Sequence, residues 1–532
     1  MNNADLIVAT LRAAGTITGF GIPSGNVLPL MEAMRRGGID FILTAHEGSA
    51  GFAAEVTGRL TGKPGLCIAT LGPGATNLAT GIGSAFLDRS PMIAITCNLH
   101  ENQLGRRLQM YIDHHALFRP ITKATLPLRH GRIAETVTEA LRIALSEPQG
   151  PVHLDLPEDV ALAETDESLH APAVISPLAA PATETIDRAR AALARAKRPI
   201  VVIGADARRM TDLVVLRRFV ERHRIPFAVT TMAKGLIDEN HELSLGCIER
   251  ACRQVQRQFL CSADLVLGLG YDTVEVEYEA WIGDTPLIHI GVEPADVAPT
   301  VKLAHQVVGD LEAAIKALER LPATSHSWDI AEIASHRARF AEALRPPVNA
   351  LSPHQVIDVV RDVLPRDGIL SFDVGAHTHQ VASQWTAPMP RGFLITNGWS
   401  SMGFALPAAI AAKLAAPERP SVCMLGDGCF QMTCGELAVA KRIGGALPVV
   451  VLDDGWLSLI RVKQMRRDLP TYGTDLKNEQ DDPPSHYFGV PVVAVQDAVA
   501  LRSALKKALV ADHPVVIEAR VNPDHYATTV YD

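Results

Sequence analysis

The segment between residues 421 and 455 most constrains how this chain can fold. It predicts a strand over residues 421–425, a helix over about 433–443 that ends at two glycines, and a second strand over 449–452. In a strand–helix–strand unit of this kind the two strands are parallel, so their carboxyl ends lie at one edge of the sheet. The segment therefore predicts a parallel sheet with helices packed against it.

Two acidic motifs stand where these two strands end. Gly426-Asp427-Gly428 follows the first strand, and Asp453-Asp454-Gly455 follows the second. Each motif alone is a common turn. Two carboxylates at one edge, beside a glycine turn and a helix N-terminus, suit a hard divalent cation that carries a phosphate group. The pair predicts a magnesium–diphosphate site with Asp427 and Asp454 as metal ligands.

This pair resembles the fingerprint of thiamine-diphosphate enzymes, in which Gly-Asp-Gly precedes an Asn-Asn pair by a similar interval. The similarity to the acetolactate-synthase-like branch extends along essentially the whole chain. It implies that Gly426-Asp427-Gly428 and Asp454 hold the cofactor, with magnesium bound by Asp427, Asp454 and the backbone carbonyl of Trp456. Asp453-Asp454 replaces Asn-Asn, which keeps an acceptable magnesium ligand and adds negative charge.

Near the other end of the chain, His46-Glu47-Gly48 precedes a predicted helix rich in Gly and Ala. From the residues alone, Glu47 could simply favour the helix dipole. In the family, a Glu at this place hydrogen-bonds the aminopyrimidine ring and takes part in the proton exchange that activates the cofactor. The resemblance therefore makes Glu47 the catalytic acid–base group, which must be shielded from water.

Three further segments are similar to cofactor-binding segments of the family. Gly72 and Asn77 lie in a Gly-Pro-Gly-Ala-Thr-Asn stretch, which is a weak nucleotide loop because Asn stands where the last Gly of Gly-x-Gly-x-x-Gly belongs. Met402 corresponds to the residue that wedges under the cofactor, although from the residues alone it is a core residue. His377 corresponds to a diphosphate contact. If extended, His377 and His379 would share a face and could mimic a metal pair.

The residues that would meet the substrate are less sharply marked. Gln109 and Lys123 fall where the family places a Gln and a Lys at the substrate entrance, and Gln109 is counted with the catalytic residues. The intervening Asp113-His114-His115 is typical of a solvated loop. Lys463 replaces the tryptophan that helps choose the acceptor in acetolactate synthase. A cation there would attract a carboxylate, sulfonate or phosphate, or would point to solvent. The replacement weakens the case for acetolactate synthesis itself.

Two linkers divide the 532 residues into three α/β blocks. The first, over about 165–185, is rich in Ala, Pro and Ser; in the second, over about 321–353, prolines flank a charged helical stretch. We expect an N-terminal pyrimidine-binding domain (1–165), a central Rossmann-like domain (185–325) and a C-terminal diphosphate- and magnesium-binding domain (350–532). Each is expected to be a doubly wound parallel sheet. Predicted strands cover 199–204, 265–270, 287–291 and 369–372, and a helix capped by Ser352 runs to about residue 364.

The central block could host a nucleotide, because Gly268-Leu269-Gly270 follows a strand and Glu293 ends another, but the motif lacks its final Gly. Acetolactate synthases bind FAD here and carry an Arg-Phe-Asp-Asp-Arg segment. This chain has Gly270-Tyr271-Asp272-Thr273-Val274 without the arginines. FAD or an ADP-like ligand is therefore left open but not favoured.

Composition excludes several classes. A net charge of -9 argues against nucleic acid as a partner. With 47% hydrophobic and 20% charged residues, the chain reads as a soluble globular protein. No apolar run is long enough to span a bilayer, and no secretory signal is evident. Eight cysteines without Cys-x-x-Cys indicate neither zinc nor a disulfide framework. These observations predict a cytoplasmic protein.

The resemblance implies cleavage or formation of a C–C bond next to a carbonyl, most simply decarboxylation of a 2-oxo acid with aldehyde release or carboligation. A 2-hydroxyacyl-CoA lyase and an FAD-dependent 2-oxo acid oxidase are alternatives. A non-catalytic paralogue that binds a nucleotide or partner belongs to another class, and the presence of Glu47, Asp427 and Asp454 argues against it. In the family the site lies between subunits, which implies a homodimer or homotetramer. The substrate stays open.

Overall fold

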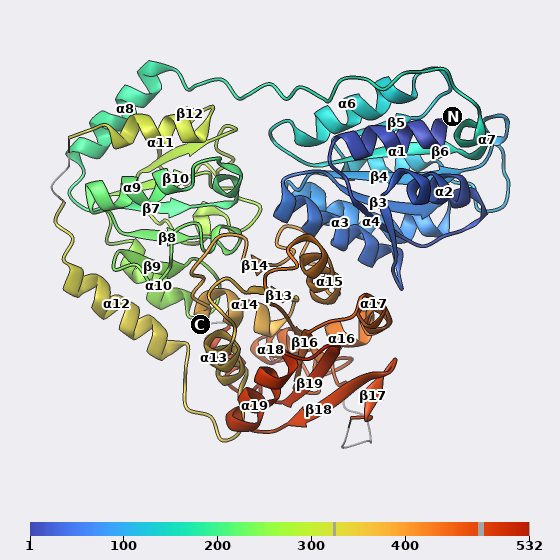
Figure 1. The fold of residues 1–532 in the computed structure, drawn as a ribbon. Coiled ribbons are helices and arrows are strands. Elements are labelled where there is room, and N and C mark those ends of the chain that lie inside the picture. Colours follow the sequence, from blue (N-terminus) through green and yellow to red (C-terminus); the bar gives the residue numbers. More distant parts are fainter. Residues whose placement is uncertain (323–325, 477–482, 531–532) are drawn as a thin grey trace.

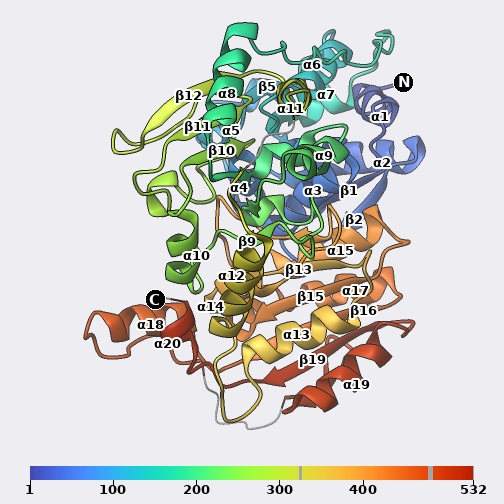
Figure 2. The same ribbon diagram turned by 90° about the vertical axis from the view of Figure 1, so that its left-hand side faces the viewer.

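The computed structural model describes residues 1–322, 326–476 and 483–530. Three domains, each built on one sheet, follow one another along the chain, and helices cover both faces of each sheet (Figure 1). This arrangement confirms the expected α/β class of three doubly wound, mainly parallel sheets. Turned by 90°, the C-terminal sheet lies below the other two (Figure 2).

The N-terminal sheet is parallel throughout, in the order β2-β1-β3-β4-β6-β5. One face packs against α1, α2 and α6, and the other against α3 and α4. Because both faces are covered, the inner strands are buried along nearly their whole length. The strands are β1 (Thr18–Gly21), β2 (Asp40–Leu43), β3 (Gly65–Thr70), β4 (Met92–Asn98), β5 (Ala124–Pro127) and β6 (Pro151–Pro157); the helices are α1 (Asn3–Ala13), α2 (Leu28–Gly37), α3 (Glu47–Thr61), α4 (Pro73–Leu87), α5 (His114–Phe118), α6 (Ile133–Leu145) and α7 (Glu158–Leu162).

The central sheet is also parallel, in the order β12-β11-β10-β7-β8-β9. Its predicted strands are confirmed to within one residue. A long helix, α12 (Ile330–Ala343), packs on α10 and leads to the C-terminal sheet. The other elements are β7 (Pro199–Ile203), β8 (Phe227–Val229), β9 (Ser244–Cys247), β10 (Leu265–Leu269), β11 (Leu287–Gly291), β12 (Leu303–Val308), α8 (Thr183–Arg195), α9 (Val214–His223), α10 (Arg253–Leu260) and α11 (Leu311–Glu319).

The C-terminal sheet runs in the order β14-β13-β15-β16-β19-β18-β17, and among its described strands β17 pairs antiparallel with β18. Ser352 caps α13 in a capping box, as its sequence predicts. The strands are β13 (Ile369–Phe372), β14 (Phe393–Leu394), β15 (Ser421–Gly426), β16 (Leu447–Asp453), β17 (His486–Tyr487), β18 (Val490–Val495) and β19 (Pro514–Arg520); the helices are α13 (Pro353–Val363), α14 (Ala376–Gln384), α15 (Ala405–Ala415), α16 (Asp427–Thr433), α17 (Glu436–Ile443), α18 (Ser458–Arg466), α19 (Ala498–Ala508) and α20 (Tyr526–Thr529).

Three local expectations are wrong. The helix expected over about residues 433–443 is α17, but the turn expected before it is another helix, α16, that begins directly at Asp427. The segment with His377 and His379 is helical, so these side chains do not share the face of an extended strand. His114, expected in a solvated loop, is 1% exposed. Local sequence patterns do not predict these features, because they depend on contacts with distant parts of the chain.

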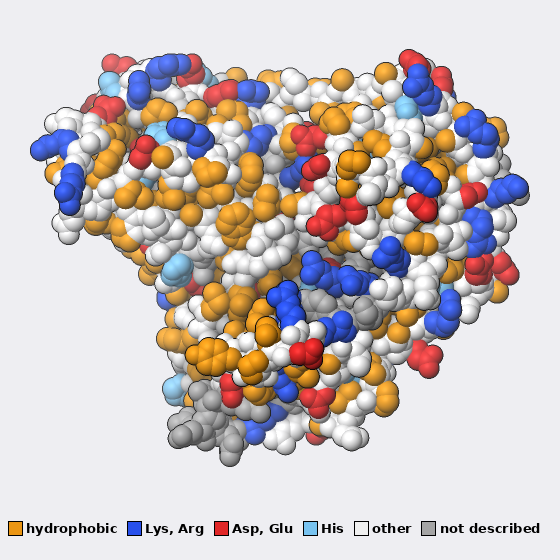
Figure 3. Space-filling view, turned by 180° about the vertical axis from the view of Figure 1, so that it is seen from behind, with side chains coloured by type: hydrophobic (Ala, Val, Ile, Leu, Met, Phe, Trp, Pro, Cys, Tyr) orange, Lys and Arg blue, Asp and Glu red, His pale blue; other side chains and the backbone are white. Residues whose placement is uncertain are grey.

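The N-terminal and C-terminal domains pack against each other through α3 and α15 (Figures 1 and 2). The rings of Phe52 and Phe404 lie 5.5 Å apart across this contact. Asp88, after α4, accepts hydrogen bonds from the backbone of Asn397 and Gly398. Seen from behind, acidic and basic side chains form separate groups near the middle of the molecule (Figure 3). No helix in the described part of the chain is long and apolar enough to cross a membrane.

Candidate active site

The two acidic motifs lie side by side at the carboxyl edge of the C-terminal sheet. β15 and β16 are parallel neighbours, with Gly426 paired to Leu452. The Asp427 carboxylate accepts a hydrogen bond from the backbone of Gly455 (2.8 Å), so the first motif is tied to the second. Asp454 accepts hydrogen bonds from the Trp456 backbone (2.9 Å) and the Ser458 hydroxyl (2.7 Å). The edge therefore presents two fixed carboxylates.

The environment of these carboxylates disfavours two negative charges. Burial, followed by the proximity of Asp454, raises the pKa of Asp427 to about 8. Burial raises the pKa of Asp454 to about 6, while its hydrogen bond from Ser458 lowers it. A divalent cation between them would relieve this repulsion, and carboxylate oxygens are the ligands that magnesium prefers. The donor set thus fits the expected metal.

His377 lies in a cradle of glycines next to this pair. A Cβ at Gly375 would lie 2.9 Å from the imidazole, and one at Gly426 would lie 3.2 Å from it. Nε2 of His377 is buried and has no hydrogen-bond partner among the described residues. Burial lowers the pKa of His377 to about 4, so the ring is neutral at neutral pH. A buried, unpaired ring nitrogen beside a glycine turn fits a phosphate oxygen.

Met402 borders the same turn, because a Cβ at Gly428 would lie 3.4 Å from its terminal methyl. Its segment is held by Asp373, a buried residue that follows β13. The Asp373 carboxylate accepts hydrogen bonds from the backbone amides of Gly403 (2.9 Å) and Ala405 (3.0 Å). Sequence reasoning missed Asp373, although its place at the end of a predicted strand could have indicated it.

Glu47 begins α3 in the N-terminal domain and is 8% exposed. Its carboxylate accepts a hydrogen bond from the Asn77 side chain (3.0 Å), so the structure joins two of the predicted residues. Glu436 of α17 accepts hydrogen bonds from the backbone of Ala45 and His46. The turn that presents Glu47 is therefore anchored on the C-terminal domain, a contact between distant segments that no sequence motif indicates.

Gly72 must be glycine for two reasons. Its φ is 60°, and a Cβ would lie 2.3 Å from the carbonyl oxygen of Met110. This contact brings the segment that carries Gln109, whose side chain is exposed, against the Gly-Pro-Gly turn. The Gly72 amide also donates to Nε2 of His114 (3.4 Å).

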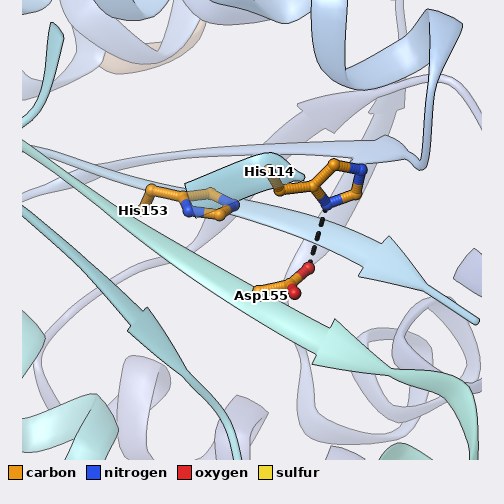
Figure 4. Close-up of side chains that lie close together, drawn as sticks. All are labelled: His114, His153 and Asp155. Atoms are coloured by element: carbon orange, nitrogen blue, oxygen red, sulfur yellow. Dashed lines mark hydrogen bonds and ion pairs between the residues drawn. The ribbon is translucent and has the colours of Figure 1, made fainter. Parts of the chain in front are cut away.

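His114, His153 and Asp155 form a buried cluster behind this turn (Figure 4). Nδ1 of His114 lies 3.0 Å from the Asp155 carboxylate. The Thr96 hydroxyl lies 2.9 Å from Nδ1 of His114 and 2.8 Å from Nε2 of His153. The spacing would suit a metal, but the three ligand atoms are already hydrogen-bonded. We therefore interpret the cluster as a polar network that supports the Gly72 turn; sequence reasoning missed it.

The two lysines predicted to meet substrate differ in their surroundings. The ammonium of Lys123 donates to the carbonyls of Ile143 and Ser146, both at 2.6 Å, at the end of α6. Burial lowers the pKa of Lys123 to about 8. Lys463 lies partly exposed on α18, seven residues after Trp456, whose ring is covered by Arg461. In this chain Lys123 thus binds the backbone, whereas Lys463 lies on the helix that follows the metal motif.

Within the described residues, no hydrogen bond or ion pair joins Glu47 to Asp427, Asp454 or His377. Glu47 and Asn77 belong to the N-terminal sheet, and the carboxylate pair and His377 belong to the C-terminal sheet (Figure 1). The predicted residues therefore fall into two groups, one in the N-terminal domain and one in the C-terminal domain.

Comparison with known proteins assigns all three sheets. Residues 1–117 match the thiamine pyrophosphate enzyme N-terminal TPP binding domain, 186–318 the central domain, and 373–519 the C-terminal TPP binding domain. The chain is 31% identical to the acetolactate synthase large subunit of Corynebacterium glutamicum, over 98% of this chain and 87% of that protein. It is 29% identical to the acetolactate synthase large subunit of Lactococcus lactis, over 99% of this chain and 93% of that protein. Acetolactate synthase of Bacillus subtilis is also 29% identical, over 98% and 93%.

Proposed function

Since the chain belongs to the thiamine pyrophosphate enzymes and catalyses decarboxylation or carboligation with that cofactor, we propose that its donor substrate is a 2-oxo acid. When bound, thiamine diphosphate supplies a nucleophilic carbon and then accepts the electrons left by carbon dioxide. The product is an aldehyde or the adduct with a second carbonyl compound. The observation that carries this proposal is the buried Asp427–Asp454 pair beside the unpaired nitrogen of His377.

In this proposal Asp427 and Asp454 bind magnesium through their side chains, and Trp456 binds it through its carbonyl. His377 donates from Nε2 to a diphosphate oxygen. The amides around Gly426 and Gly428, at the N-terminus of α16, also face the diphosphate. Support comes from the raised pKa values of both aspartates, which a cation would lower again.

Glu47 is proposed to exchange a proton with the aminopyrimidine ring. It is shielded from water, and Asn77 holds one of its oxygens by a hydrogen bond. Gly72 lets the backbone approach the ring, and Met402 supports the bent form of the cofactor. Gln109, exposed near the Gly72 turn, would contact the substrate. These roles agree with the burial of Glu47 and the exposure of Gln109.

Lys463 is proposed to attract the charged end of an anionic substrate. Within the described part of the chain it forms no ion pair, and it lies on the helix that follows Asp454. Lys123 is the weaker candidate, because its ammonium is already bound to two backbone carbonyls. A lysine in place of the acceptor-selecting tryptophan favours an acceptor other than that of acetolactate synthase.

We propose no flavin step. The central crevice that would receive FAD has a volume of about 860 Å³ and is lined by carboxylates, among them Asp206, Asp272 and Glu293. These three surround the guanidinium of Arg89, with ion pairs of 3.6, 2.7 and 2.8 Å. The diphosphate of FAD would meet this excess of negative charge. The residues that line this crevice therefore do not fit FAD, which disfavours the FAD-dependent 2-oxo acid oxidase.

We also propose the domain bounds 1–165, 185–325 and 350–532, and a homodimer or homotetramer with each active site between two subunits. The two matched TPP binding regions, residues 1–117 and 373–519, lie in different domains, as expected for a site that a second subunit completes. An N-terminal half-site of one subunit would then complete the C-terminal half-site of its partner.

The test is carbon dioxide release from a panel of 2-oxo acids, with thiamine diphosphate and magnesium present. Glu47→Gln serves as the control and should lose roughly 100-fold or more of the turnover while keeping cofactor affinity. Carbon dioxide release from one acid by the wild type, but not by Glu47→Gln, would establish the donor. Product analysis would then distinguish aldehyde release from ligation. If no acid is cleaved, the proposal fails, and 2-hydroxyacyl-CoA substrates become the next panel.

A further inference from the structure

A cavity of about 220 Å³ lies where the three domains meet. Its walls come from the end of α3, from the loop after α4, from the turn that follows β7 and from the segment before β14. The described residues that line it include no carboxylate. They include six cationic side chains: Arg59, Arg89, Arg208, Arg209, Lys234 and Arg391.

Four of these cations have carboxylate partners behind the wall. Lys234 pairs with Glu239, and Arg59 pairs with both Glu55 and Asp88. Arg89 and Arg209 share the Asp206 carboxylate, and each has further partners: Asp272 and Glu293 for Arg89, and Glu147 for Arg209. Even so, Nη1 of Arg89 and Nη1 of Arg209 are buried and have no hydrogen-bond partner among the described residues. Arg209 is 10% exposed, so its free nitrogen has little access to bulk water.

The other two cations lack a counter-ion in the described part of the chain. Arg208 donates to the backbone carbonyl of Asp88, and Arg391 donates to that of Leu60. Burial, then the nearby guanidinium groups of Arg59 and Arg209, lower the pKa of Arg208 to about 10. Arg208 thus lies buried against two other guanidinium groups, and the nearby carboxylates of Asp88 and Glu275 offset this repulsion only in part.

The geometry points to an anion site in this cavity, and we propose that it binds a tetrahedral oxyanion, either free phosphate or the phosphate group of a small molecule. Guanidinium groups offer pairs of donors that match phosphate oxygens. A volume of about 220 Å³ lies below the usual range of about 300–1,000 Å³ for ligand pockets, so a dinucleotide would not fit.

This site is separate from the proposed cofactor site. Glu47 lies at the first residue of α3, whereas the cavity is bordered by Gly58 and Gly62 at the opposite end of that helix. An oxyanion bound here would join side chains from all three domains. Binding should therefore stabilise the whole chain, and the assay does not depend on the 2-oxo acid chemistry.

The experiment measures the melting temperature of the holoenzyme, at fixed thiamine diphosphate and magnesium, in a buffer free of phosphate and sulfate. Inorganic phosphate, sulfate and AMP are titrated separately, with sodium chloride at matched ionic strength. We expect a saturable rise with phosphate and sulfate. A tighter response to AMP would identify a phosphate ester as the preferred ligand, whereas no response to AMP would identify the free anion.

Two substitutions test the assignment. Arg391→Gln, at the exposed mouth, and Arg208→Gln, inside, should each weaken the apparent affinity about tenfold, since a hydrogen bond to a charged group contributes about 1.5–3 kcal/mol. Arg195→Gln, an exposed arginine on α8, is the matched control and should leave the titration unchanged. Arg391→Gln keeps the test valid if Arg208→Gln does not fold. No saturable rise in the wild type, or an equal rise in Arg391→Gln, would overturn the proposal.

Discussion

The proposed metal motif carries Asp453-Asp454 where the thiamine-diphosphate fingerprint has an Asn-Asn pair, and this changes the electrostatics of the sheet edge. Asp427, Asp453 and Asp454 crowd one sheet edge, and the effect reaches Asp427 through both neighbours. With the metal bound, the extra charge would strengthen cation binding; without it, at least one carboxyl group holds a proton at neutral pH. The affinity of this edge for a metal therefore depends on the charges of these aspartates.

Two substitutions at Asp454 distinguish the loss of a metal ligand from the loss of a negative charge. Asp454→Ala removes an oxygen ligand and should weaken magnesium-dependent cofactor binding by at least about 100-fold. Asp454→Asn keeps an oxygen ligand and should lose far less. A magnesium titration that follows cofactor binding measures both. Asp453→Asn removes a neighbouring charge without removing a proposed ligand. If Asp454→Ala titrated like the wild type, Asp454 would not be a metal ligand.

Lys463 can be tested at the same scale, because its proposed contact is with substrate charge. Lys463→Ala should raise the Michaelis constant for an anionic substrate roughly tenfold with little change in kcat, since one partly exposed charge pair is lost. Lys506→Ala, another lysine of the C-terminal domain, is the matched control. Equal Michaelis constants in Lys463→Ala and the wild type would show that this side chain only meets solvent.

At the residue scale, motifs at predicted strand ends located Asp427 and Asp454 at one edge. Sequence reasoning did not find Asp373, Glu436 or His114, because each acts through a partner distant in the chain. Glu436 caps the turn at Ala45, and the two residues are joined only by domain packing. A local pattern carries no information about such pairs, so supporting residues stay hidden until the domains are assembled.

At the scale of elements, apolar runs between glycines predicted the strands, because a strand buried on both faces leaves a strong signal. The helices near the candidate site were harder to predict from the sequence. α16 begins at Asp427, where a turn was expected, and α14 covers the segment of His377 and His379, for which an extended conformation was considered. Elements that carry ligands are shaped by neighbouring strands as much as by their own propensities.

The linker helix α12 gives a stability prediction. His336 is fully buried, donates from Nε2 to Gln256 (2.7 Å) and stacks on Phe259. Burial lowers its pKa to about 4, below the ordinary value of 6.5. The unfolded chain therefore takes up a proton at this residue at a higher pH than the folded chain does. Stability should fall as the pH drops from 6.5 toward 4, with no contribution from this group above that window.

His336→Gln removes this titration and keeps a polar partner for Gln256. Between pH 7.5 and 5, its melting temperature should fall less than that of the wild type, by an amount that corresponds to on the order of 1 kcal/mol. Thermal unfolding at both pH values measures the difference. His170→Gln, at an exposed position, should behave like the wild type. An identical fall in His336→Gln and the wild type would contradict a buried neutral histidine.

At the scale of the whole molecule, the proposed proton-transfer residue Glu47 belongs to the N-terminal domain, whereas Asp427 and Asp454 belong to the C-terminal domain. α3 packs on α15, and Asp88 holds the backbone of Asn397 and Gly398, so the N-terminal and C-terminal domains are fixed to each other. In the proposed homodimer, Glu47 of one subunit would instead act with Asp427 and Asp454 of its partner.

Mixing two inactive variants tests this assembly. Glu47→Gln and Asp454→Ala should each be nearly inactive alone. In a mixed dimer, one site combines both defects, and the other combines the intact Glu47 of one subunit with the intact Asp454 of its partner. Random exchange of subunits at equal amounts gives half mixed dimers, so about a quarter of the wild-type activity should return.

The measurement is turnover after co-expression or after denaturation and refolding of the mixture. Mixing each variant with the wild type controls for loss on refolding. If the mixture stays inactive while those controls recover, both groups must act within one chain, and the site between subunits is wrong.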